Sequence, residues 1–168
     1  DSFTYKANDG SLDSNEATVS IAVASVNDPP VAMDDSYSVA EGGTLPVSAA
    51  SGVLSNDTDA EQDPLTAVLV GDVSHGTLVL TGDGSFTYIH DGSETTSDSF
   101  TYKANDGTED SDEATVSIAV APVNDPPVAT DDSYSVAEGG TLIVSAASGL
   151  VSNDTDAEQD PLTAVLVG

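Results

Sequence analysis

Apolar and polar residues alternate over several stretches of the chain, most clearly near its middle. The run EATVSIAVA at 113–121 alternates strictly, with valine and isoleucine on one side and threonine, serine and alanine on the other. The run DSFTYKA at 98–104 does the same, with Phe100 and Tyr102 facing one way and Lys103 the other. A period of two residues is typical of strands buried on one face. Both runs are therefore predicted to be half-buried β-strands.

Turn residues divide the rest of this region into further short strands. The run GTLVLTGDGSFTYI at 76–89 holds two strand-like stretches around Thr81-Gly82-Asp83-Gly84, which predicts a hairpin. Other candidate strands are SYSVA at 36–40, TLPVSAA at 44–50 and LTAVLVG at 65–71. No stretch keeps a helical period over more than two turns. About seven short strands with Gly, Asp, Asn and Pro between them predict an all-β fold, a two-sheet antiparallel β-sandwich.

The chain is internally repetitive with an interval of 97 residues. Residues 1–71 align with 98–168 without a gap and differ at only eight positions. An interval of this length suits one small β domain per repeat rather than a solenoid unit. The predicted division is the C-terminal part of a preceding repeat at 1–28, one complete repeat at 29–125, and the N-terminal part of a following repeat at 126–168.

Charge narrows the range of partners. The chain has 30 acidic residues against only Lys6 and Lys103, for a formal net charge of −28. Phosphate recognition depends on cationic side chains, so nucleic acid is excluded as a partner. The acids gather in loops, as at 57–63, where carboxylates offer the oxygen ligands that calcium requires. A solvated acidic rim and adaptation to high salt are the alternative interpretations of these loops.

Other chemistry is poorly represented. The chain has no cysteine and no apolar run of membrane-span length, so direct membrane insertion is not expected. His75 and His90 are the only histidines, and no hydrolase, metalloprotease or phosphate-loop motif is present. The chain is therefore not expected to be an enzyme. A sugar-binding role is disfavoured as well, because nearly every aromatic residue lies in a core pattern.

Three segments carry a resemblance to a known family. The stretch FTYKANDGTEDSDEATVSIAVAPVNDPPVA resembles the last two strands and the linker of a cadherin repeat. The stretch VAEGGTLIV resembles the cadherin segment that carries a calcium-binding glutamate, and NDTDA resembles its paired aspartates. As a whole, the repeat resembles the bacterial cadherin-like and Ig-like (VCBS-type) tandem repeats of large surface proteins and RTX-type adhesins.

The resemblance implies calcium sites at the two junctions between repeats. At the first junction it brings Asn27 and Asp28 to Asp57, Asp59 and Asp106 of the following domain.

At the second junction the resemblance implies that Asn124 and Asp125 meet Glu41 from the domain before and Asp154 and Asp156 from the segment after.

The chain also departs from the cadherin pattern. Pro29 and Pro126 replace the second asparagine of the linker, and Asp91 and Glu94 lie near the place of a D-x-E ligand pair with the wrong spacing. We therefore expect fewer ions per junction than in cadherins. The paired prolines stop the preceding strand and favour an extended, stiff linker.

The expected function is a structural extender, or stalk repeat, of a large extracellular bacterial surface protein or adhesin, stiffened by calcium. Its expected partners are the neighbouring repeats of the same chain. The alternative is a repeat unit of a self-assembling extracellular filament, sheath or matrix, which would also bind other copies of the chain. Near-identical repeats suit either role, because a spacer needs length and no single repeat needs its own chemistry.

Overall fold

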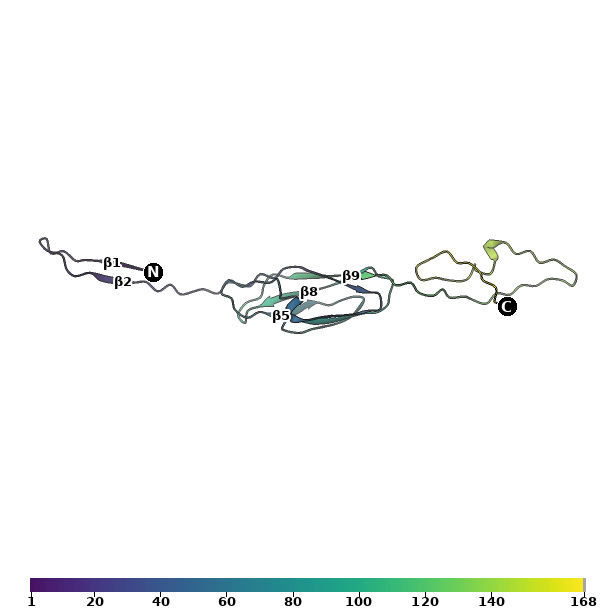
Figure 1. Cartoon of the computed structure of the whole chain (residues 1–168), viewed down its shortest axis with the longest axis horizontal. Helices are drawn as coiled ribbons and strands as arrows, with labels where there is room; N and C mark the ends of the chain where they lie inside the picture. The colour runs from purple at the N-terminus through teal and green to yellow at the C-terminus, as the bar shows by residue number, and fades with distance from the viewer. Residues whose placement is uncertain (168) are drawn as a thin grey trace.

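The fold is all-β, as the alternating pattern predicts, and three parts follow one another in a row (Figure 1). The structure is a computed structural model that describes residues 1–167, so Gly168 lies outside the described residues. These residues form no α-helix, and none of their helical turns is long and apolar enough to cross a bilayer. The elements are β1 (Ser2–Tyr5), β2 (Ala17–Ser20), β3 (Asp35–Ala40), β4 (Thr44–Val47), the 3-10 turn η1 (Ala49–Ser51), β5 (Thr66–Gly71), β6 (Gly76–Leu80), β7 (Phe86–His90), β8 (Ser97–Asn105), β9 (Ala114–Ala121) and the 3-10 turn η2 (Ala146–Ser148).

The central part is a sandwich of two sheets with seven strands. One sheet has the order β3-β9-β8-β5 and the other the order β4-β7-β6. The predicted hairpin is confirmed as β6–β7, in which Leu80 lies opposite Phe86. The pair β3–β9 is parallel, whereas the other pairs of these two sheets are antiparallel. Because the first and last strands run in the same direction, the chain enters the sandwich at one end and leaves it at the other (Figure 1).

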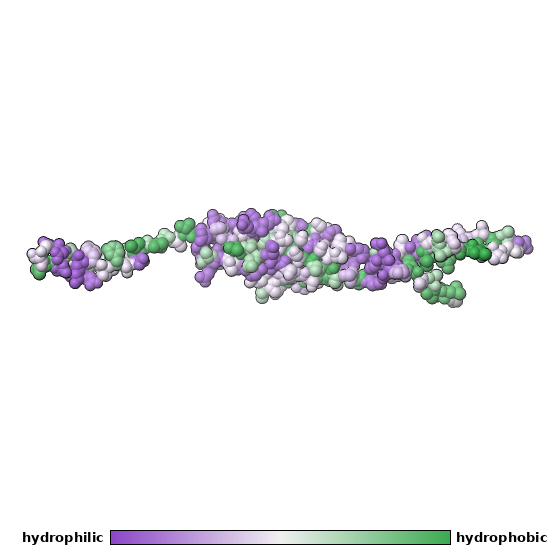
Figure 2. Space-filling view, turned by 90° about the horizontal axis from the view of Figure 1, so that it is seen from above, coloured by the Kyte–Doolittle hydropathy of each residue, from purple (hydrophilic) through white to green (hydrophobic). Residues whose placement is uncertain are grey.

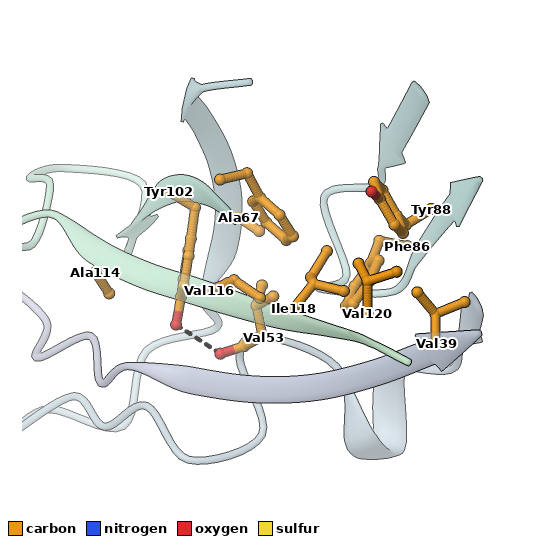
Figure 3. Close-up of a cluster of buried hydrophobic side chains, with 11 residues drawn as sticks. Val39, Val53, Ala67, Phe86, Tyr88, Tyr102, Ala114, Val116, Ile118 and Val120 are labelled. Carbon is orange, nitrogen blue, oxygen red and sulfur yellow. Dashed lines mark hydrogen bonds between the residues drawn. The ribbon is translucent and has the colours of Figure 1, made fainter. Parts of the chain in front are cut away.

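The core lies between the two sheets and consists of the inward positions of the alternating runs (Figure 3). In β9, Val116, Ile118 and Val120 are buried, which confirms the predicted face. In β8 the buried aromatic residues are Phe100 and Tyr102. A buried aromatic side chain removes a large apolar area from water, so these positions supply much of the driving force for folding.

Tyr102 connects the core to the loops at one end of the sandwich. Its ring is fully buried, and its hydroxyl donates to the carbonyl oxygen of Val53 at 2.7 Å (Figure 3). The same hydroxyl oxygen lies 3.1 Å from both carboxylate oxygens of Asp57. The Tyr102 hydroxyl thereby ties the loop before β5 to the core of the sandwich.

The flanking parts contain the same residues without the same burial. Phe3 is 55% exposed, whereas its repeat equivalent Phe100 is 1% exposed. Val136 is 55% exposed, whereas its equivalent Val39 is 8% exposed. Residues 1–28 form only the antiparallel pair β1–β2. The same sequence is therefore buried only where both sheets are present; the domain boundaries at 29 and 125 stay a prediction.

Candidate metal centre

At the first junction the linker contacts two acidic loops of the central sandwich. The Asn27 side-chain amide donates to Asp106 Oδ2 at 2.9 Å. The backbone N–H of Asp28 donates to Glu61 Oε2 at 3.2 Å. The predicted neighbourhood of Asn27 and Asp106 is therefore present in the structure, and Glu61 is an additional acidic neighbour.

Asp106 is held in place by the loop that follows β8. Its Oδ1 atom accepts the backbone N–H groups of Thr108 at 2.6 Å and Glu109 at 2.8 Å. The hydrogen bonds from Glu109, Asn27 and Thr108 hold the pKa of Asp106 below its usual value. The carboxylate is thus ionised at neutral pH and fixed in orientation, two properties of a good cation ligand.

Asp57 and Asp59 lie near this junction but face different surroundings. Asp57 Oδ1 accepts the backbone N–H of Met33 at 2.8 Å, and its carboxylate contacts the Tyr102 hydroxyl. Asp59 Oδ1 accepts the N–H of Asp63 at 2.9 Å, while its Oδ2 is buried without a hydrogen-bond partner among residues 1–167. Asp57 therefore supports the sandwich, and Asp59 keeps one oxygen free for a ligand. Their predicted contact with a metal stays a prediction.

At the second junction the linker is held between the central sandwich and the segment that follows. The N–H of Val123 donates to Glu41 Oε2 at 3.2 Å, and the N–H of Asp125 donates to Glu158 Oε1 at 2.9 Å. The Asn124 amide donates to the carbonyl oxygen of Asp125 at 3.1 Å. Glu41 thus lies beside the linker, as predicted.

The two predicted aspartates of the following segment hold their own loop. Asp154 Oδ1 accepts the N–H of Thr130, and Asp156 Oδ1 accepts the N–H of Asp160, both at 2.8 Å. The acidic residue that reaches the linker from this segment is Glu158.

Three carboxylates from distant parts of the chain converge at this second junction. Glu41, Glu94 and Glu158 each offer an oxygen, and these oxygens lie within 4.8 Å of one another. Glu158 Oε2 is buried and has no hydrogen-bond partner within the described chain. Burial, followed by the charges of Glu41, Glu158 and Asp125, raises the pKa of Glu94. The cluster is therefore an arrangement of mutually repelling oxygens, whose charges a bound cation would neutralise.

The donor set fits calcium. It consists of three carboxylate oxygens, which are ligands that hard divalent cations prefer. A chain without cysteine offers no thiolate for a softer metal. Hydrophilic residues also gather where the central sandwich meets each flanking part, as the surface view shows (Figure 2).

Sequence reasoning missed Glu158 and set Glu94 aside. Glu158 follows Asp156 by two residues and directly precedes Gln159, where the chain turns sharply with a φ of 62°. The same motif occurs in the first copy, where Glu61 precedes Gln62, also with a φ of 62°. The repeated sequence DAEQ at 59–62 and 156–159 was the available signal, whereas the left-handed turn at its glutamine is visible only in the structure.

Asp35 occupies a second acidic environment, inside the end of the sandwich. Burial raises its pKa to about 6, and the charge of Asp57 adds to this rise while the Tyr102 hydroxyl opposes it. In an unfolded chain an aspartate titrates near 3.9. The folded state therefore binds this proton more tightly. Protonation of Asp35 therefore stabilises the folded state. This contribution to the free energy of unfolding is complete below about pH 4 and is lost as the pH rises through about 6.

We expect Asp35→Asn to remove this part of the pH dependence. Because Asp35 is partly exposed, the expected gain in unfolding free energy at pH 7 is only about 1 kcal/mol. Urea unfolding between about pH 4 and 7 in chelator measures it, with Asp132→Asn, the equivalent substitution outside the central sandwich, as the control. A variant that keeps the wild-type slope would contradict the assignment.

Comparisons with known proteins agree with this architecture. The family model described as "Bacterial cadherin-like domain" matches residues 27–122, and the model described as "Bacterial Ig domain" matches residues 124–168. No curated protein matches the chain. Such domains are typically non-enzymatic structural modules, and they typically occur in extracellular surface proteins.

The likeness to solved structures is weaker. A nucleoside hydrolase-related hypothetical protein from Saccharophagus degradans, associated with carbohydrate metabolism, is 14% identical; the match covers 58% of this chain and 26% of that one, with a TM-score of 0.39. Two structures of an endo-fucoidan hydrolase from glycoside hydrolase family 107, one of them the H294Q form, are 20% and 23% identical. Each match covers 73% of this chain and 19% or 18% of the hydrolase, with TM-scores of 0.36 and 0.38.

The chain thus spans about a quarter or less of the solved proteins that it resembles. The bacterial cadherin-like model covers more than half of the chain, and the all-β sandwich agrees with it. The chain belongs to the bacterial cadherin-like domain family.

Proposed function

We propose that this chain is a stalk segment of a large bacterial surface protein or adhesin, and that calcium stiffens its junctions. In this account each sandwich supplies length and the junctions supply rigidity. The observation that carries the proposal is the convergence of Glu41, Glu94 and Glu158, because these residues come from two successive repeats.

The path of the chain supports an extender. The parallel pair β3–β9 places entry and exit at opposite ends of the sandwich, so successive domains extend the array rather than fold back. After the paired prolines, Val31 exchanges two backbone hydrogen bonds with Thr58, at 2.8 and 3.1 Å. Val128 and Thr155 form the same bridge in the next copy, at 2.8 and 3.0 Å. Each linker is thereby attached to the domain that follows it.

A cation is needed at the other end of each linker, where the linker and the segment after it meet the domain before it. At the second junction, Glu41 and Glu94 belong to the central domain, whereas Glu158 belongs to the next segment. Without a cation their charges oppose one another and push the two parts apart. A calcium ion between them would replace this repulsion with a bridge that holds both parts at one angle. In the predicted scheme, Asp125 and Asn124 would contribute further oxygens.

We expect Glu158→Gln to weaken calcium binding at the second junction by about tenfold or more, a change of about 1.4 kcal/mol or more. The substitution keeps the size of the side chain and removes a charge from the cluster. Isothermal titration calorimetry in low salt measures the effect.

The matched control is Glu61→Gln, the same change in the same motif at the first junction. The 168 residues contain no counterparts of Glu41 and Glu94 for the first junction, so we expect the second junction to bind calcium more tightly. Glu61→Gln should leave this tighter binding at the second junction unchanged. Equal losses in the two variants, or no loss in Glu158→Gln, would refute the assignment of the tighter site to the second junction.

A further inference from the structure

We propose that His90 is a positioning residue for the second junction, which holds the loops of Glu41 and Glu94 in a binding arrangement before calcium arrives. This inference rests on the proposed function. It gives a role to His90, a side chain to which the proposed function assigned none. His90 ends β7 and is only 3% exposed, an unusual environment for a histidine in a surface repeat.

Both nitrogens of the His90 ring have partners, and they lie on different segments. The Nδ1 atom accepts the backbone N–H groups of Gly42 at 3.1 Å and Gly92 at 3.2 Å. The Nε2 atom lies 3.0 Å from Thr95 Oγ1. Because Nδ1 is an acceptor, the ring is neutral with its hydrogen on Nε2, which donates to the threonine hydroxyl.

Each of these contacts falls beside a carboxylate of the cluster. Gly42 directly follows Glu41, and Thr95 directly follows Glu94. The backbone of His90 adds a third connection, because its N–H donates to the carbonyl oxygen of Gly43 at 3.0 Å. One buried ring therefore joins the turn that carries Glu41 to the loop that carries Glu94.

The cluster needs such a connection because its own charges oppose it. The oxygens of Glu41, Glu94 and Glu158 lie within 4.8 Å of one another, and the neighbouring charges raise the pKa of Glu94. Without a restraint the two loops would separate, and a cation would have to bring them together at the expense of affinity. A neutral ring supplies the restraint without placing a positive charge beside a cation site.

Three variants of His90 distinguish a role in holding the Glu41 and Glu94 loops from a role in the stability of the sandwich. His90→Phe keeps the ring volume and removes every ring hydrogen bond. His90→Asn retains an oxygen close to the place of Nδ1, so it preserves the acceptor for Gly42 and Gly92. His90→Gln reaches toward Thr95 and loses that acceptor. His75→Phe removes the other histidine, whose ring takes no part in the cluster, and serves as the control.

We expect calcium titration of the 168-residue chain to show roughly tenfold weaker binding at the second junction in His90→Phe and His90→Gln, a size typical of residues that orient metal ligands. His90→Asn should stay within about threefold of the wild type, and His75→Phe should be unchanged. First-junction binding should not change in any of them. Unchanged affinity in a folded His90→Phe, or an equal loss in His90→Asn, would overturn the proposal.

Hydrogen exchange of the metal-free wild-type protein gives a readout that depends neither on calcium nor on the folding of any variant. The Gly42 and Gly92 amides should be protected, because both donate to the buried ring. Rapid exchange at both would show that the ring does not hold these loops, which rejects the proposal. If the amides are protected but the wild-type chain binds no calcium, the calcium-stiffened function fails while the loop connection stands.

Discussion

Replacing Phe100 with alanine is expected to lower the free energy of unfolding of the central sandwich by about 3–5 kcal/mol. Phe100 is 1% exposed, and its ring lies edge-on to Phe86 at a centroid distance of 5.4 Å. The substitution removes this contact and leaves a cavity between the two sheets. A small domain has only about 5–15 kcal/mol of stability, so this loss is a large share of the total. Urea unfolding in a fixed calcium concentration measures the change.

The repeat provides a matched control in Phe3→Ala. Phe3 has the same sequence neighbours as Phe100, yet it is 55% exposed on the β1–β2 pair. Its replacement should change the unfolding free energy by no more than about 0.5 kcal/mol. If both substitutions cost the same, residues 1–28 are packed into a sandwich in solution, and the burial difference between the copies is wrong.

Most of the sandwich follows from local pattern. The period of two in 113–121 and 98–104 places β9 and β8 and names their buried faces, because one side of each strand must leave water. The glycines and aspartate at 82–84 identify the β6–β7 hairpin in the same way. The parallel pairing of β3 with β9 was not predictable, because alternation says which face is buried and nothing about which strand lies alongside.

The candidate site was predicted only in part. Motif resemblance placed Glu41 beside the second linker and brought Asn27 to Asp106. It did not select Glu94 or Glu158, because these residues meet only when a loop of one repeat approaches a turn of the next. The inward direction of Asp57 depends on the buried Tyr102 hydroxyl, which a loop motif does not reveal.

The second large effect concerns the shape of an array of repeats. With nine residues in β8, a strand spans about 30 Å, so three sandwiches in a row extend over roughly 100 Å. Bending is expected at the junctions, since each sandwich is a packed unit. Calcium should cross-link each junction through oxygens of both neighbours, so the array should become longer and more uniform. Chelation should restore repulsion between the carboxylates and leave the proline linkers as the main restraint on bending.

Monovalent salt distinguishes a calcium bridge between domains from simple screening of the carboxylate charges. Screening weakens the repulsion between carboxylates but builds no connection between domains. The alternative in which the acids are an adaptation to high salt predicts that sodium chloride alone restores an extended array. The filament alternative predicts that calcium instead increases the molecular mass, through lateral contacts between chains.

Small-angle X-ray scattering of three joined copies of residues 29–125 tests the calcium-locked junction most directly. We expect a larger maximum dimension and a narrower range of shapes in calcium than in chelator, at constant molecular mass, with no such change on adding sodium chloride. A maximum dimension and range of shapes that do not respond to chelation, or that salt alone restores, would contradict it.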